Sequence, residues 1–261
     1  MSLAHRSVYP TQSDPLRRHL DALLDGEAPE LDGEVVGLVV PDSNRQAGGE
    51  AAASAYRLLR GQEIDVAVVV SPSHSGAFGR LSICQTDAYR TPLGEVAIDD
   101  PLRHELCDED DDIFLDDTGH YHTEGADVQL PFLQRVVGDG FRAVPIVMGE
   151  EGPAFCRELG AAIGEVLYGK NAVVIGSADL LAAEPEALAR FRAALDALDE
   201  GELLHLMGSE AVRVEGMGAI VTTLIAARKR GATAAHVLAL TEPDPAEDGA
   251  PGALAVAFVR A

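Results

Sequence analysis

The chain has few of the residues on which secreted, membrane and metal-knuckle proteins depend. It contains three cysteines, two lysines and no tryptophan among its 261 residues. Three well-separated cysteines form neither a disulfide framework nor a CxxC knuckle, so we expect reduced thiols in a cytoplasmic protein. No apolar run reaches the ~18 residues of a membrane-spanning helix. The N-terminal stretch also lacks the apolar segment of a signal peptide.

Basic residues are scarce as well. Lysine and arginine total 20, against 43 aspartates and glutamates, so the formal net charge is −23. This balance argues against binding to nucleic acid or to an anionic membrane, because both require a basic face. A dispersed acidic excess with few lysines indicates a halophilic protein, since concentrated salt screens the repulsion. The alternative is a mesophile with a GC-rich genome, which also replaces lysine with arginine.

Apolar runs alternate with helical patterns along the whole chain. The runs at Val35–Val40, Asp65–Val70 and Ala172–Ile175 are almost continuous, which is typical of strands buried on both faces. This alternation predicts an α/β fold with a central, mainly parallel mixed sheet flanked by helices. Hydrophobic residues make up 47% of the chain, enough for one sizeable core. No linker divides the sequence, so we expect a single domain over residues 1–261.

Polar residues follow the three apolar runs. Asp42 comes after the first, His74 after the second and Asp179 after the third, and Glu215 precedes a predicted helix. Ligands of open α/β sheets bind beyond the carboxyl ends of the strands, so we expect these four side chains in one pocket. One imidazole with carboxylates suits Fe(II), Mn or Mg. The alternative is that His74 is a hydrogen-bonded loop residue and that both aspartates cap helices.

Three further residues are candidates for the same pocket. Ser73 precedes His74, and His122 and Glu124 belong to the run His120–Glu124. A solvated loop is the alternative for that run. Motifs for nucleophilic serine, dinucleotide, phosphate-loop or HExxH chemistry do not occur in the sequence.

Several motifs together resemble the MEMO-like proteins, whose fold is similar to that of the class III extradiol ring-cleaving dioxygenases of the LigB type. The resemblance extends over nearly the whole chain, and its most specific parts are PSH and YRTPLG. The matching segments are Ser7–Pro10, Val70–His74, Asp87–Gly94, Gln129–Phe132, Val144–Gly149 and Ser177–Asp179.

The departures from the family pattern fall in the pocket. Asp42 stands where the family has its first metal-type histidine, whereas His74 retains the second. Glu215 matches a third position that is cysteine in MEMO proteins and glutamate in the dioxygenases. Three other family histidines are replaced, and the residues found there are Glu124, Gln129 and Ala182.

The resemblance therefore implies a rebuilt, carboxylate-rich pocket with two possible roles. The first is a site without catalysis or of unknown activity, which binds a protein or peptide partner. AMMECR-type and radical-SAM proteins are the partners that the family suggests. The second is a metal-dependent oxidoreductase with Asp42, His74 and Glu215 as ligands of a divalent ion, since carboxylates favour hard cations.

Overall fold

The computed structural model describes residues 9–43, 46–107, 112–120, 125–243 and 251–261. Within these residues the main sheet has eight strands in the order β11-β12-β1-β8-β2-β7-β3-β6. Strands β1, β8, β2 and β7 are parallel, and β12 and β3 join them antiparallel on either side. The predicted α/β fold with a mainly parallel mixed sheet is confirmed. The main-sheet strands are β1 (Glu34–Val40), β2 (Val66–Pro72), β3 (Leu81–Ile83), β6 (Ile113–Leu115), β7 (Arg142–Met148), β8 (Ala172–Ser177), β11 (Ala234–Leu240) and β12 (Leu254–Arg260).

The central strands are apolar throughout because both faces of the sheet are covered. All seven residues of β2 are buried. Val66, Val68 and Val70 face one hydrophobic core, while Ala67 and Val69 face the other. A strand buried in this way requires apolar side chains at successive positions, which explains the uninterrupted runs in the sequence.

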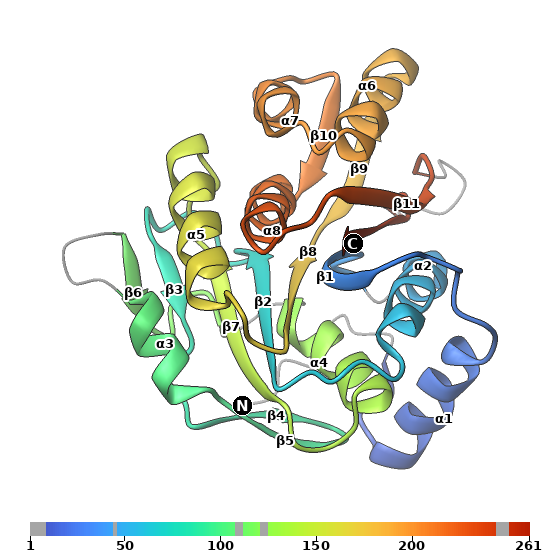
Figure 1. The fold of residues 1–261 in the computed structure, drawn as a ribbon, viewed down its shortest axis with the longest axis vertical. Coiled ribbons are helices and arrows are strands. Elements are labelled where there is room, and N and C mark those ends of the chain that lie inside the picture. The colour runs from blue at the N-terminus through green and yellow to red at the C-terminus, as the bar shows by residue number, and fades with distance from the viewer. Residues whose placement is uncertain (1–8, 44–45, 108–111, 121–124, 244–250) are drawn as a thin grey trace.

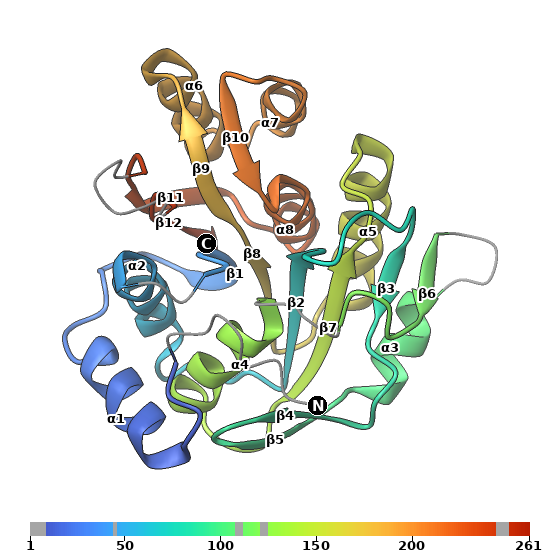
Figure 2. The same ribbon diagram turned by 180° about the vertical axis from the view of Figure 1, so that it is seen from behind.

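Helices form a layer on each face of the sheet. Figures 1 and 2 show α5 and α8 on one face and α1, α2 and α4 on the other. No helix among the described residues is long and apolar enough to cross a membrane. The helices are α1 (Ser13–Leu24), α2 (Gln46–Tyr56), the short 3-10 helix η1 (Arg57–Leu59), α3 (Asp100–Leu106), α4 (Gly125–Val136), α5 (Pro153–Val166), α6 (Pro185–Asp196), α7 (Glu200–Met207) and α8 (Met217–Lys229).

Two small antiparallel ribbons are added at opposite ends of the sheet. The ribbon of β4 (Ala88–Thr91) and β5 (Gly94–Ala97) contains the YRTPLG motif. The ribbon of β9 (Asp179–Ala183) and β10 (Val212–Glu215) lies beyond the carboxyl end of β8, together with α6 and α7 (Figures 1 and 2). Strand β10 then leads directly into α8, so this second ribbon borders the sheet rim where ligands of α/β folds bind.

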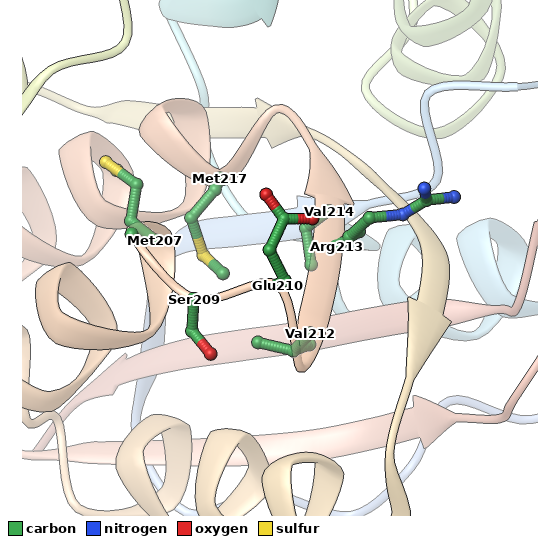
Figure 3. Close-up of a pocket in the computed structure, with 8 residues that line it drawn as sticks. Met207, Ser209, Glu210, Val212, Arg213, Val214 and Met217 are labelled. Atoms are coloured by element: carbon green, nitrogen blue, oxygen red, sulfur yellow. The ribbon is translucent and has the colours of Figure 1, made fainter.

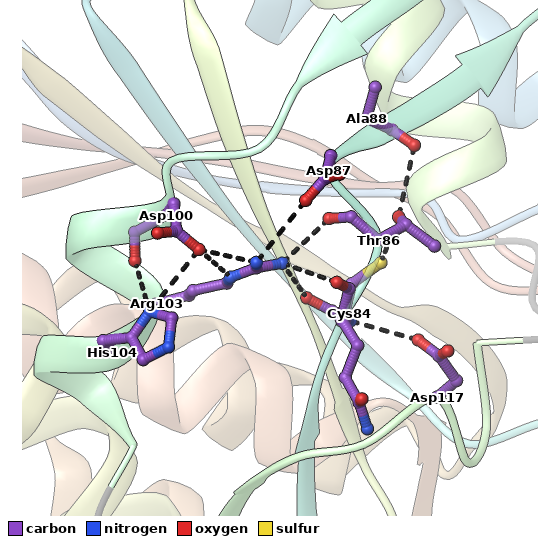
Figure 4. Close-up of polar contacts among 9 residues, drawn as sticks. Cys84, Thr86, Asp87, Ala88, Asp100, Arg103, His104 and Asp117 are labelled. Carbon is purple, nitrogen blue, oxygen red and sulfur yellow. Dashed lines mark hydrogen bonds and ion pairs between the residues drawn. The ribbon is translucent and has the colours of Figure 1, made fainter.

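A buried arginine fixes the segment that follows β3. The side chain of Arg103 is 9% exposed, and its guanidinium pairs with Asp100 at 2.5 Å. It also donates to three successive carbonyl oxygens, those of Cys84 at 3.3 Å and of Gln85 and Thr86 at 2.8 Å (Figure 4).

Burial raises the pKa of the Cys84 thiol. All three cysteines are free, which agrees with the expectation of thiols without a disulfide.

Candidate functional site

The carboxyl ends of the four central parallel strands bring polar residues to one rim of the sheet. Asp42 lies two residues after β1, His74 two after β2, Glu151 three after β7 and Asp179 two after β8. Glu215, the last residue of β10, completes the group. We call Asp42, His74, Glu151, Asp179 and Glu215 the rim cluster. Four of them were expected together from the sequence, and contacts link those four: His74 touches Asp42 and Glu215, and Asp179 binds the backbone of Asp42.

The imidazole of His74 lies between two carboxylates. Its Nε2 is 2.6 Å from Oδ2 of Asp42, and its Nδ1 is 3.5 Å from Oε1 of Glu215. Burial by itself lowers the pKa of His74, but the two carboxylates outweigh it and raise that pKa to about 10. The two carboxylates therefore favour the protonated imidazole, for which each of them is an ion-pair partner.

A chain of hydrogen bonds holds Asp42 from the interior. The hydroxyl of Tyr56 donates to Oε1 of Gln129 at 2.9 Å, and Nε2 of Gln129 donates to Oγ of Ser177 at 2.9 Å. The Ser177 hydroxyl then donates to Oδ1 of Asp42 at 2.5 Å. Each group donates a hydrogen bond to the next, and the carboxylate of Asp42 is the final acceptor. The orientation of Asp42 is therefore set by the buried network.

Asp179 fixes the turn that carries Asp42. Its two carboxylate oxygens accept hydrogen bonds from the backbone N–H groups of Asp42 and Ser43, both at 3.1 Å. Burial and the charge of Asp42 raise the pKa of Asp179 to about 6, against the opposing effect of these hydrogen bonds. Asp179 thus titrates close to neutral pH while it positions the neighbouring acid.

Glu151 is a member of the rim cluster that the sequence analysis missed. Its Oε2 accepts a hydrogen bond of 2.6 Å from the backbone N–H of Gly218, in the first turn of α8. Burial is the main cause that raises its pKa to about 7, and the charges of Glu215 and Asp42 add to it. The signal was available, because Glu151 follows an apolar strand just as Asp42 and His74 do.

Glu215 reaches His74 because the backbone before α8 passes very close to β8. Gly216 has φ +83°, a left-handed conformation that favours glycine. A Cβ atom at Gly216 would lie 2.4 Å from the carbonyl oxygen of Ser177 and 3.1 Å from Cα of Ala178. Glycine at this position is therefore needed to bring the β10–α8 junction against the rim.

The remaining sequence candidates are not part of this cluster as described. The hydroxyl of Ser73 donates to the carbonyl oxygen of Gly76 at 2.8 Å and stabilises a turn. His122 and Glu124 lie outside the described residues. Ala182 occupies β9, opposite Arg213 of β10.

The fit of the rim cluster to a divalent metal depends on which nitrogen of His74 each carboxylate contacts. A histidine ligand uses one ring nitrogen for the metal and commonly gives the other to a carboxylate. Because Asp42 contacts Nε2 and Glu215 contacts Nδ1, only one of these carboxylates can share a metal with His74 in this arrangement. Within the described part of the chain, no group of three or more His, Cys, Asp or Glu side chains is placed to hold a metal ion. The three expected ligands do not fit a common metal in this geometry.

A small pocket lies between the end of α7 and β10 (Figure 3). Its volume is about 240 Å³. Its lining residues are Met207, Gly208, Ser209, Glu210, Val212, Arg213, Val214 and Met217. The pocket and the cluster share β10, since Val214 lines the pocket and the next residue, Glu215, belongs to the cluster.

Comparisons with known proteins agree with the sequence motifs. A family model described as Memo-like protein matches residues 2–248. A MEMO1 family protein of Methanopyrus kandleri is 32% identical over 250 residues, which cover 88% of this chain and 87% of that protein. Another, of Sulfolobus acidocaldarius, is 33% identical over 201 residues, with 74% and 71% covered. An uncharacterized protein of Escherichia coli K12 has a TM-score of 0.57 at 14% identity, over 86% of this chain and 100% of that chain, which shows a shared fold.

Proposed function

This chain belongs to the Memo-like protein family, and from that premise we propose that its rim cluster binds a cationic group of a peptide or protein partner. The supporting observation is the position of the His74 imidazole between two carboxylates, which favour its protonated form. The two negative charges of Asp42 and Glu215 exceed the single positive charge of a protonated His74. Asp179 and Glu151 add negative charge as they ionise near pH 6 and pH 7. An incoming cation balances this excess without a metal ion.

A catalytic role for His74 is poorly supported. A general base must be deprotonated at the working pH, and a pKa of about 10 keeps His74 protonated. Ala182, which stands where the family has a histidine, supplies no replacement. Binding of a cationic group requires only the negative charge that the cluster already carries.

The alternative is a metal-dependent enzyme related to the extradiol dioxygenases. It requires the ion to displace the proton of His74 and one of the two carboxylates to move, because they contact different ring nitrogens. The positions of these side chains favour the cationic partner over this alternative.

Calorimetric titration with two short peptides tests the proposal. Acetyl-Gly-Arg-Gly-amide should bind the protein, and acetyl-Gly-Gln-Gly-amide should bind at least tenfold more weakly. Glu215→Gln should remove this preference, because Glu215 is 41% exposed and is the accessible acid of the cluster. Glu165→Gln, an exposed acid on α5, makes the same change in net charge and should leave the preference intact. Equal binding of both peptides to the unaltered protein would reject the proposal.

A further inference from the structure

The segment between β2 and β3 carries His74 along the rim of the sheet. Because β7 lies between these two strands in the sheet, the segment must pass the carboxyl end of β7 to reach β3 (Figure 2). We call residues 73–79 of this segment the strap. Its middle residues, 75–77, are exposed. Among the described residues, the polar contacts that join the strap to other segments are made by His74 and Phe78.

The ring of Phe78 holds the far end of the strap in a seat built from two glycines. The backbone N–H of Phe78 donates to the carbonyl oxygen of Gly149 at 3.1 Å. A Cβ atom at Gly149 would overlap the ring, and one at Gly119 would lie 2.9 Å from its Cε1. No larger residue therefore fits at Gly149 while the ring is in place. The guanidinium of Arg80 lies over the same ring, 5.7 Å from its centroid.

Gly76 and Gly79 have a different role from the two glycines of the seat. Their φ angles are +95° and +65°, in the region that favours glycine, and a Cβ atom at either position would meet nothing within 4 Å. These two glycines therefore serve backbone conformation, whereas Gly149 makes room for the ring. The strap bends on both sides of Phe78, and the seated ring is what holds it against the rim.

His74 occupies the position that an incoming cation would take. Its imidazole contacts Asp42 at 2.6 Å and Glu215 at 3.5 Å. The Asp42 side chain is 1% exposed and that of His74 is 18% exposed, so the acid is closed to a ligand while the imidazole is in place. A guanidinium or ammonium group that contacts both acids must therefore displace His74.

We propose that the strap is autoinhibitory: His74 fills the cation site from within the chain, and Phe78 in its glycine seat holds His74 there. The proposal rests on the proposed function of the rim cluster and describes how that function is regulated. A cationic partner binds the form with the strap released, so its apparent affinity falls with the fraction of molecules in that form. Phe78 is a positioning residue in this arrangement, because it acts on the site through His74.

Two substitutions should release the strap by different routes. Phe78→Ala removes the ring, and Gly149→Ala places a methyl group where the ring lies. Both variants should bind acetyl-Gly-Arg-Gly-amide about fivefold more tightly than the unaltered protein, because more molecules then have the strap released. A defect that merely disordered the site would weaken binding instead. Phe114→Ala, which removes a partly exposed ring from β6, is the control and should leave the affinity unchanged.

The double variant Phe78→Ala/Gly149→Ala checks that both changes act on one seat. It should bind the arginine peptide no more tightly than the better single variant, since the seat can be emptied only once. A further gain equal to the product of the two single effects would show that the glycine and the ring act independently, and would overturn the role of the seat.

The position of His74 can be followed by NMR independently of peptide affinity. The chain has eight histidines, and His74→Gln identifies the ring signal of His74 by its loss. In Phe78→Ala and Gly149→Ala this signal should move toward that of His104, which is exposed on α3. Saturation of the unaltered protein with acetyl-Gly-Arg-Gly-amide should move the signal in the same direction, because the peptide displaces the imidazole.

The outcomes separate the strap from the cation site. The proposal is overturned if the arginine peptide binds the unaltered protein but neither variant moves the His74 signal or raises the affinity; the cation site then stands without the strap. It is also overturned if His74 moves and the affinity falls, since His74 would then belong to the binding surface. If His74 moves but no variant prefers the arginine peptide to acetyl-Gly-Gln-Gly-amide, the proposed function fails, and the inhibitory role of the strap fails with it.

Discussion

The hydroxyl of Ser177 donates a 2.5 Å hydrogen bond to the carboxylate of Asp42, across 135 residues of sequence. This bond joins the end of β8 to the turn after β1 and is the last link of the buried chain from Tyr56. Asp42 is 1% exposed, so water does not replace a lost donor at this position. The orientation of the acid that contacts His74 therefore depends on residues in the protein interior.

Removal of this hydroxyl should destabilise the protein. Ser177→Ala leaves a buried carboxylate with one donor fewer, which costs about 1–3 kcal/mol of unfolding free energy. Ser71→Ala is a matched control, because Ser71 is also buried at the end of a central strand but its hydroxyl makes only a 3.5 Å contact with the carbonyl oxygen of Ile146. Urea unfolding of both variants measures the difference. Equal losses would show that the Asp42 contact contributes nothing specific.

The sequence predicts much of the rim cluster because the apolar runs mark the ends of the central strands. Those runs place Asp42, His74 and Asp179 at one edge, and Glu215 follows from its position before a helix. Gln129 was placed in the pocket only through the family resemblance, and Tyr56 was not assigned, since the hydrogen bonds of these two residues cross 48 to 88 residues and depend on how α2 and α4 pack. The β9–β10 ribbon was also missed, because two strands of five and four residues give too short a pattern.

Glu151 should make stability depend on pH around neutrality. Its pKa is raised from 4.5 to about 7 in the folded protein, so the folded state favours the protonated acid. This contribution is fully present below about pH 4.5 and is lost as the pH rises through 7. Glu151→Gln, which is neutral at every pH, should therefore raise the melting temperature relative to the unaltered protein at pH 8 more than at pH 5. The same relative shift at both pH values would show that Glu151 does not titrate in this range.

Arg103 should not tolerate replacement by lysine. A lysine ammonium cannot reproduce the fork that contacts three carbonyl oxygens and Asp100, so Arg103→Lys should lose about 2 kcal/mol or more of unfolding free energy. Arg90→Lys is the control, because Arg90 is 86% exposed and pairs with Glu95 at the surface. Its effect should remain within about 0.5 kcal/mol. Thermal or urea unfolding compares the two, and a similar small loss for both would contradict the role of Arg103.

Salt should stabilise the fold well into the molar range. The chain has 43 acidic residues against 20 basic ones, and the Debye length falls to about 3 Å at 1 M salt. Screening at that length removes repulsion between neighbouring carboxylates. The melting temperature should therefore rise continuously with added KCl. A melting temperature that is flat from low to high salt favours the explanation by genome composition instead of halophily.

Divalent metal should have little effect on the protein at neutral pH. A metal must displace the proton of His74, and the carboxylates of Asp42 and Glu215 oppose this because they raise the pKa of the imidazole well above its usual value. A ligand that binds only the folded state raises stability by about 2.7 kcal/mol at a hundredfold excess over its Kd, so a real site would be visible in thermal melts.

We expect Mn(II) to leave the melting temperature unchanged, and His74→Ala to destabilise the metal-free protein because Asp42 loses its buried ion pair. His104→Ala, at an exposed position on α3, is the control and should have a much smaller effect. A rise in melting temperature with Mn(II) at pH 7 that His74→Ala abolishes would reverse this conclusion, and the metal-dependent alternative would then replace the cationic partner.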